Sequence, residues 1–446
     1  MIMILLTACG RAAAYAPAAV ETQETLPENA DISCEAPPVR PNVCIDRLGY
    51  EPGSNKTVVF RGTWLQDTFT IRDTESGAVV YTGATEKRKN IPEGTEYDSY
   101  GDFSDFTVPG SYYIQIARYG ESYPFVIADN INRSFFQRAC LRLYEMRGGT
   151  AGAAGGWQSD AAGEAREIET SLCMYQLLLS YELFPEVYTD DTGIAESGNE
   201  IPDILDECGY GAVWLLNRAQ EQPERSGVCA IYRAAALAKY GWLIRNTDAE
   251  LADECLNAAE AAWKQGEKDL FVSDDLVAMA AAELYRLTGA GQYLGLAEEY
   301  LGNSAKKAEP LSDAEFFGSI TYMNTKNKVD MELCNTMIRK IMGEAEGIAE
   351  LSRQNPFLVC DRGKAGDAAG LLQETLRICV VNHIITNHEY NTVIENHFHY
   401  LMGCNPDSIC HVSLWDEEMA QCGVVAQEPV QISAVIFLLS ELLSGK

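Results

Sequence analysis

The 446-residue sequence is poor in positive charge and has no long apolar run. It contains 34 lysines and arginines against 65 aspartates and glutamates, which gives a formal net charge of −31. A surface with that field repels phosphate groups, so we expect neither nucleic acid nor anionic lipid headgroups as partners. No segment reaches the ~20 uncharged apolar residues that a transmembrane helix requires. A neutral polysaccharide would meet no electrostatic barrier.

The common signatures of cofactor chemistry are absent as well. The sequence has no phosphate-binding loop, no dinucleotide fingerprint, no convincing Ser-His-Asp set and no CxxC pair. His397 and His399 stand two residues apart on an expected helix, so they point away from each other and do not indicate a metal site. We therefore expect no cofactor and no metal. Several of the 14 cysteines lie in apolar helical stripes, where a thiol acts as a small buried hydrophobe: Cys140, Cys173, Cys255 and Cys379.

The first 41 residues are expected to form an export signal (1–9) and a disordered tether (10–41). The start of the chain is apolar and ends in Leu6-Thr7-Ala8-Cys9, which fits the cleavage box of a bacterial lipoprotein with Cys9 as the lipidated residue. The alternative is a fortuitous apolar start. The tether is rich in Ala, Pro, Glu and Thr and has no apolar period. We expect an exported protein at the cell surface, attached to the membrane only through this lipid.

Residues 42–129 are expected to form a small β-sandwich. Short runs of β-branched and aromatic residues, such as Thr57–Phe60, are separated by glycine- and proline-containing turns. Large apolar residues recur at every second position at Tyr112, Ile114 and Ile116, the period of a strand with one buried face. Several such strands over roughly ninety residues are typical of a sandwich.

Residues 132–446 are expected to be all α-helical. Apolar residues recur at helical spacing, for example at Leu276, Ala280 and Leu284. The pattern predicts no strands and about ten helices, near 133–146, 168–183, 203–220, 229–245, 251–263, 273–287, 332–350, 368–387, 390–403 and 431–443. This pattern favours paired helices wrapped in a ring. Asp313 and Glu315 are interpreted as solvated loop charges, and Asp203, Asp206 and Glu207 as capping and packing residues.

Ordered blocks of sequence in both parts resemble one known family. The opening Asn42–Phe60 and the segment Pro109-Gly-Ser-Tyr-Tyr113 resemble the immunoglobulin-like domain found before the catalytic module in many cellulases of glycoside hydrolase family 9. Gly155-Gly-Trp157, Glu200–Glu207 and Tyr400–Pro406 resemble the catalytic module of that family. The resemblance implies an immunoglobulin-like sandwich followed by an (α/α)6 toroid whose wide face holds a glucan cleft.

The carboxylates that this resemblance implies are out of register. Inverting glycosidases use one carboxylate as a base that activates water and another as an acid that protonates the leaving oxygen. In the family the base lies in a Trp-x-Asp-Ala-Gly-Asp stretch, but here the two aspartate positions fall on Ser159 and Ala162. A shift of one residue would supply Asp160, and a further insertion would bring in Glu164.

The acid and the substrate-binding residues are assigned by the same resemblance. Glu428 stands at the position of the acid, although its other interpretation is a charged residue ahead of Pro429 at a helix start. Trp157 and Tyr210 are assigned to substrate binding. The histidine- and cysteine-bearing loop that can hold zinc in the family is lacking after Arg147, and the shorter loops imply a shallower cleft.

Two functions follow from these observations. The first is a cell-surface glycoside hydrolase of the cellulase type. It would hydrolyse β-1,4-glucan or a related neutral β-glucan with inversion, using Glu428 as acid and Glu164 or Asp160 as base. The second is a non-catalytic relative that binds glycan or a protein partner. The displaced aspartates indicate that hydrolysis is impaired or absent.

Overall fold

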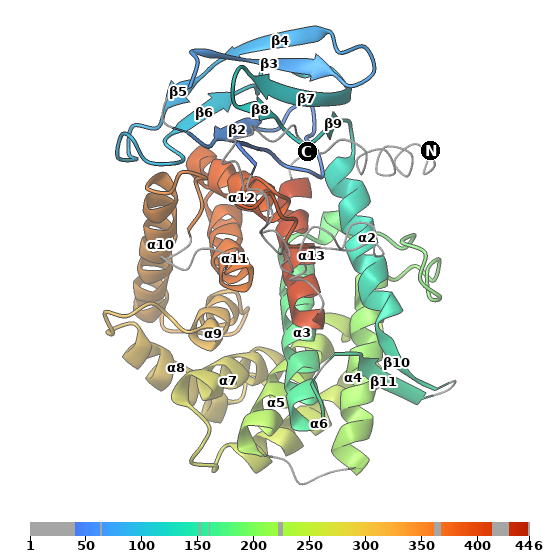
Figure 1. Ribbon diagram of the computed structural model, residues 1–446. Coiled ribbons are helices and arrows are strands. Elements are labelled where there is room, and N and C mark those ends of the chain that lie inside the picture. The colour runs from blue at the N-terminus through green and yellow to red at the C-terminus, as the bar shows by residue number, and fades with distance from the viewer. Residues whose placement is uncertain are drawn as a thin grey trace, which may run out of the picture. The chain divides into compact units, whose positions relative to one another are not determined.

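A computed structural model describes residues 41–62, 65–150, 153–159, 161–221, 226–360, 367–412 and 428–444 (Figure 1). Cys9, the expected tether and Asp160 lie outside the described residues. Within these ranges, no helix is both long enough and apolar enough to cross a membrane. Contacts divide the chain into two compact units. The first comprises the described parts of Met1–Ser134, Ala349–Leu371 and Asn387–Val425, and the second those of Phe135–Ile348, Leu372–Thr386 and Ala426–Lys446.

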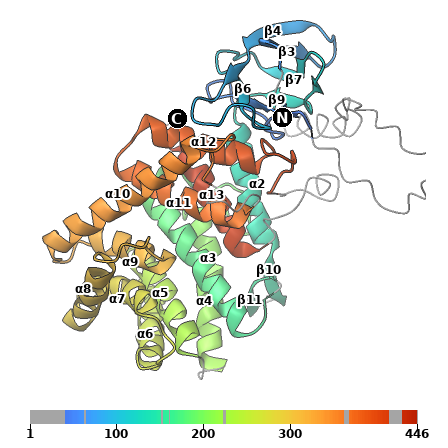
Figure 2. The ribbon, with the colours of Figure 1, turned by 60° about the vertical axis from the view of Figure 1, so that its left-hand side comes forward.

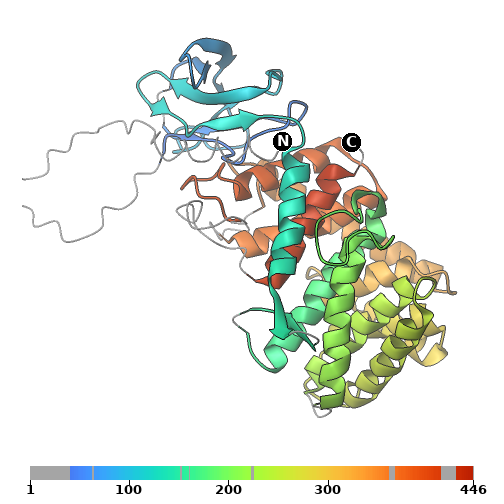
Figure 3. The same cartoon turned by 90° about the vertical axis from the view of Figure 1, so that its right-hand side faces the viewer.

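The first unit begins with a sandwich of two antiparallel sheets (Figure 3). One sheet has the order β1 (Val43–Cys44), β2 (Thr57–Phe60), β6 (Ser99–Asp102), β5 (Glu86–Lys87). The other has the order β4 (Val79–Ala84), β3 (Thr68–Asp73), β7 (Gly110–Ile116), β8 (Gly120–Glu121), with β9 (Phe125–Ile127) also paired to β7. Tyr112, Ile114 and Ile116 all face the core, which confirms the alternation expected from the sequence.

The sandwich packs against α12 (His388–Leu401) within the same unit. His399 Nδ1 lies 2.7 Å from Asp46 Oδ2, and its Nε2 lies 3.0 Å from the carbonyl oxygen of Asn55. Burial raises the pKa of Asp46, although the hydrogen bond from His399 opposes the shift. On the same helix His397 faces elsewhere, toward Ser352 and the backbone N–H of Cys360. The two histidines therefore have separate structural partners, as their spacing predicted.

The second unit consists of paired helices. Their bounds, including segments that cross between units, are α2 (Ile131–Glu145), α3 (Glu164–Leu183), α4 (Asp203–Glu221), α5 (Gly227–Ile244), α6 (Ala249–Gly266), α7 (Asp274–Thr288), α8 (Gly291–Ser304), α9 (Asp313–Met323), α10 (Met331–Arg353), α11 (Ala368–Ile384) and α13 (Pro429–Leu443). A short 3-10 helix, η1 (Pro185–Val187), follows α3. Of the four cysteines expected to be buried, Cys173, Cys255 and Cys379 have no accessible surface, whereas Cys140 is only half-buried.

Four elements of this part differ from the sequence-based expectation. β10 (Arg147–Thr150) and β11 (Ala153–Trp157) form an antiparallel hairpin where only helices were expected. α8 and α9 were not among the ten expected helices. α9 begins with a capping box in which Ser312 accepts from the N–H of Glu315, so Asp313 and Glu315 form its first turn rather than a loop. Apolar periodicity did not predict these elements, because the hairpin is glycine-rich, α8 contains three glycines and α9 is short.

The helices α3, α5, α7, α9 and α13 run in one direction, and α4, α6 and α8 return between them (Figure 2). Contacts at both ends of each neighbouring pair establish this direction. Near the N-terminal ends the contacts are Glu164–Ser226, Gly227–Asp269 and Asp275–Ser312, and the start of α13 at Pro429 contacts Cys173 in the middle of α3. Further along they are Glu182–Lys239, Lys239–Glu283, Thr321–Glu283 and Gln176–Ser433.

A buried ionic network joins three of these helices. Lys239 on α5 and Arg286 on α7 each contact both Glu182 and Glu283, and the four side chains are 0–7% exposed. Burial alone would raise the pKa of Glu182, but the charges of Lys239 and Arg286 outweigh it and lower the pKa to about 2. These buried ion pairs hold α3, α5 and α7 in register, because a shift of one helix would separate a pair and leave an uncompensated buried charge.

Candidate functional site

The N-terminal ends of the parallel helices meet at one end of the second unit. Glu164, the first residue of α3, accepts a hydrogen bond from the backbone N–H of Ser226, which caps α5. The N–H of Gly227 donates at 2.8 Å to Asp269, which lies just before α7. Pro429, the first residue of α13, lies against Cys173 on α3. The starts of α3, α5 and α7 thus lie together, and α13 begins beside the middle of α3.

Glu428 lies at the N-cap of α13. Its backbone N–H donates to Gln431 Oε1 at 3.4 Å, as in a capping box, and Pro429 follows as the first helical residue. The side chain is half-buried, with its Oε2 atom enclosed. Glu428 is therefore both the N-cap residue of α13 and the residue assigned as the acid.

Glu164 does not lie beside Glu428. Its Oε1 accepts from Ser226 at 3.0 Å, which directs the carboxylate toward the start of α5. Cys173, which contacts Pro429, lies nine residues further along α3. At 1.5 Å per residue this is about 13 Å along the helix axis. The structure thus engages Glu164 in a helix cap and separates it from the expected acid, while Asp160 falls outside the described residues.

A carboxylate that the sequence did not single out lies beside Ser159. Glu169 on α3 accepts a hydrogen bond from Ser159 Oγ through its Oε2 at 2.6 Å, and Ser159 Oγ accepts in turn from the N–H of Ala161 at 3.2 Å. Ala162 is exposed. The sequence did contain a signal: Glu169 precedes Cys173 by four residues, so the two share one face of α3.

Trp157 is a packing residue, contrary to its assignment to substrate binding. Its side chain has no accessible surface, and its Nε1–H donates to Glu207 Oε1 at 2.6 Å. Arg147 forms an ion pair with the same carboxylate at 2.9 Å. An enclosed indole presents no face on which a sugar ring could stack. Glu207 thus has the packing role expected for it.

Tyr210 anchors the β10–β11 hairpin. Its hydroxyl donates to the carbonyl oxygen of Gly148 and accepts from the N–H of Gly155 at 2.9 Å. The guanidinium of Arg147 lies over its ring, 4.6 Å from the centroid. Both polar capacities of the hydroxyl serve the hairpin, so the observed contacts assign Tyr210 to its support.

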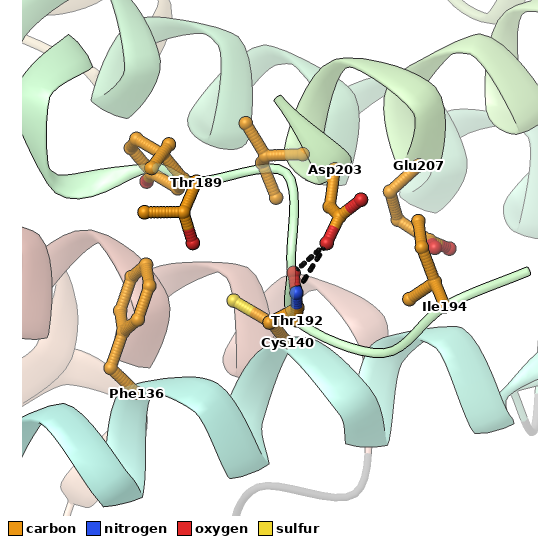
Figure 4. Close-up of a pocket in the computed structure, with 9 residues that line it drawn as sticks. Phe136, Cys140, Thr189, Thr192, Ile194, Asp203 and Glu207 are labelled. Carbon is orange, nitrogen blue, oxygen red and sulfur yellow. Dashed lines mark hydrogen bonds between the residues drawn. The ribbon is translucent and has the colours of Figure 1, made fainter. Parts of the chain in front are cut away.

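A small cavity lies between α2 and α4 and does not form a glycan site. Its volume is about 10 Å³, which is room for about one water molecule. Asp203, Thr192, Cys140 and Phe136 line it, and Thr192 donates to Asp203 through both its backbone N–H and its hydroxyl (Figure 4). Among the described residues, no three histidine, cysteine or acidic side chains are arranged to hold a metal ion.

Comparison with known proteins identifies both parts of the chain. A model of the cellulase N-terminal ig-like domain matches residues 39–121, and a model of glycosyl hydrolase family 9 matches residues 219–423. Neither Glu164 nor Glu428 lies within the matched ranges. The chain is 23% identical over 424 residues to endoglucanase D of Acetivibrio thermocellus, covering 74% of this chain and 66% of that protein. It is 21% identical over 480 residues to a xyloglucan-specific endo-beta-1,4-glucanase of Bacteroides ovatus, covering 83% and 80%.

Solved structures share the fold. A metagenome-derived family 9 endoglucanase matches with a TM-score of 0.72 and 19% identity, over 90% of this chain and 98% of that one. A mutant thermostable endoglucanase from Alicyclobacillus acidocaldarius matches with a TM-score of 0.70 and 17% identity, over 90% and 99%.

The fold is thus that of a two-domain glycoside hydrolase, an immunoglobulin-like sandwich followed by an (α/α)6 barrel. The chain belongs to glycoside hydrolase family 9, with the N-terminal immunoglobulin-like domain of cellulases. It spans slightly less than two thirds of the length of the first curated relatives, 66% and 64%.

Proposed function

We propose that the chain is a cell-surface glycoside hydrolase of the cellulase type, which cleaves β-1,4-glucan or a related β-glucan with inversion. The observation that carries the proposal is the position of Glu428 at the N-cap of α13, directly before Pro429, which contacts Cys173 in the middle of α3. Glu428 would protonate the leaving oxygen. The relatives named endoglucanase and xyloglucan-specific endo-beta-1,4-glucanase support a neutral β-glucan as substrate.

Two apolar side chains support a glycan surface at this end of the helices. Leu270 is 97% exposed and Phe271 is 89% exposed, in the turn that leads into α7. Asp269 holds this turn, because its carboxylate accepts from the N–H groups of both Phe271 and Gly227. An exposed ring held in a defined position is suited to the apolar face of a sugar.

A non-catalytic glycan-binding protein is the second candidate. The observation that favours it is the engagement of Glu164 with the cap of α5, together with a serine and an alanine at the positions of the family's aspartates. Under this hypothesis the chain keeps the fold and binds glycan through Leu270 and Phe271, but it does not activate water.

Release of reducing ends from carboxymethylcellulose and xyloglucan tests the first candidate. We expect turnover by the wild-type chain, an α-configured product by NMR, and a loss of about 100-fold or more in Glu428→Gln. Glu299→Gln, an exposed glutamate on α8, is the matched control and should leave turnover unchanged. Binding of cello-oligosaccharide without turnover would support the second candidate, and absence of both would contradict both.

We also propose that Cys9 carries a lipid that attaches the chain to the membrane. The support is the Leu-Thr-Ala-Cys segment, since these residues lie outside the described structure. Fractionation of cells that express the wild-type chain and Cys9→Ser tests it. We expect the wild-type chain with membranes and the variant in the soluble fraction; equal partitioning would contradict the lipid anchor.

A further inference from the structure

The packing surface between α3 and α13 carries two carboxylates near the start of α13. Cys173 Sγ contacts the carbonyl oxygen of Pro429 at 3.5 Å, and one turn later Ser433 Oγ donates to Gln176 Oε1 at 2.6 Å. The two helices therefore run parallel with this register. Glu169 precedes Cys173 by four residues, and residues at this spacing lie on one helix face.

The register places Glu169 close to Glu428. Glu428 directly precedes Pro429, and Glu169 lies one turn, about 6 Å, from Cys173 along α3. The axes of packed helices are about 8–10 Å apart. With the axial offset of about 6 Å, the two backbone positions lie on the order of 10–12 Å apart. Glutamate side chains that extend toward each other from these positions can bring the carboxyl groups to the ~6.5–9.5 Å that leaves room for a water in inverting glycosidases. Glu164, at about 13 Å along the same axis, fits this spacing less well.

Glu169 is also oriented. Its side chain is half-buried, and the hydroxyl of Ser159 donates to its Oε2 at 2.6 Å. The backbone N–H of Ala161 donates to Ser159 Oγ at 3.2 Å, which leaves the hydroxyl proton directed at the carboxylate. A carboxylate held through one oxygen can accept a proton on the other. Ser159 is therefore a positioning residue for Glu169.

We propose that Glu169, rather than Glu164 or Asp160, is the general base of this chain; the inference rests on the proposed function. Glu169 takes one proton from a water whose oxygen bonds to the anomeric carbon, while the bond from that carbon to the glycosidic oxygen breaks. Glu428 gives its proton to the departing oxygen. The products are a sugar with an inverted anomeric hydroxyl and a free chain end; Glu169 then releases its proton to solvent, and Glu428 takes one up from solvent.

Turnover of a soluble β-glucan by Glu169→Gln, Glu169→Ala and Glu299→Gln tests the assignment. We expect a loss of about 100-fold or more in both Glu169 variants and no change in Glu299→Gln. Sodium azide, a small nucleophile that needs no base, should restore turnover of a cellobiosyl fluoride of β configuration in Glu169→Ala and give the α-configured glycosyl azide. Restoration distinguishes a base from a residue that only stabilises the fold. Ser159→Ala should lower kcat by a smaller factor than Glu169→Gln.

The outcomes separate the two levels of the proposal. Wild-type turnover that persists in Glu169→Gln, or that is lost in Glu164→Gln instead, overturns the assignment of the base and leaves the glycosidase intact. If Glu169→Ala loses turnover that azide does not restore and its Tm is lowered, the assignment of the base is also overturned, and Glu169 is a residue that stabilises the fold. No turnover by the wild-type chain on any β-glucan overturns both.

Discussion

The indole Nε1–H of Trp157 donates to Glu207 at 2.6 Å, and both side chains are buried. Arg147 neutralises the same carboxylate from the other strand of the hairpin. Burial raises the pKa of Glu207, although the charge of Arg147 and its hydrogen bonds oppose the shift. The three side chains thus join the β10–β11 hairpin to α4 through one buried charge.

Trp157→Phe is expected to destabilise the fold by about 1–3 kcal/mol, because it leaves a buried carboxylate without one of its donors. Urea unfolding measures the change. Trp263→Phe is the matched control, since Trp263 is similarly buried and packs edge-on against Tyr293; it should cost less. Equal losses in the two variants, or a loss of glycan affinity without a loss of stability in Trp157→Phe, would contradict the packing role.

Glu182→Gln is expected to flatten the acid side of the stability profile. The folded pKa of Glu182, about 2, lies below its ordinary value of 4.5. Its ionised form therefore contributes stability above about pH 5, and this contribution, on the order of 3 kcal/mol, is lost as pH falls toward 2. Unfolding free energies between pH 5 and 2.5 test this. A variant whose stability falls as steeply as that of the wild-type chain would exclude Glu182 as the source.

Glu441→Gln is expected to stabilise the chain at pH 8 and to have little effect at pH 5. Burial, aided by the charge of Glu186, raises the pKa of Glu441 to about 7, although Asn382 donates to the carboxylate. A raised carboxyl pKa means that stability is lost as pH rises through the window from 4.5 to 7, by on the order of 2–3 kcal/mol. Thermal melts at the two pH values measure the difference. The same change in Tm at both would show that ionisation is not the cause.

Phe271→Ala is expected to weaken binding of cello-oligosaccharide about fivefold, or ~1 kcal/mol, without lowering stability, because the ring is almost fully exposed. Isothermal titration calorimetry measures the affinity, and it does so whether or not the chain hydrolyses the ligand. Val79→Ala, at an exposed apolar position of the sandwich, is the control. Unchanged affinity in Phe271→Ala would remove this ring from the glycan surface.

Local patterns predicted most of the architecture. The alternation at Tyr112, Ile114 and Ile116 predicted a strand with one buried face, and the apolar stripe of α7 predicted that helix, because each pattern reflects one neighbouring layer. The hairpin β10–β11 was not predicted, since its glycine-rich strands are held by Tyr210 and Trp157 rather than by their own side chains. The start of α9 carried a capping signal, Ser312 followed by Glu315. This signal was overlooked because Asp313 and Glu315 were interpreted only as loop charges.

The sequence by itself determined which elements form and which family they belong to, because periodicity, turns and ordered motifs are properties of consecutive residues. It also showed that the expected aspartates are replaced at Ser159 and Ala162. Only the tertiary structure decided which carboxylate lies beside which helix end. Glu164 bonds to Ser226, Glu169 bonds to Ser159, and α3 runs parallel to α13, contacts that join residues up to 257 positions apart. Such contacts arise from the packing of helices against one another, which no local pattern specifies.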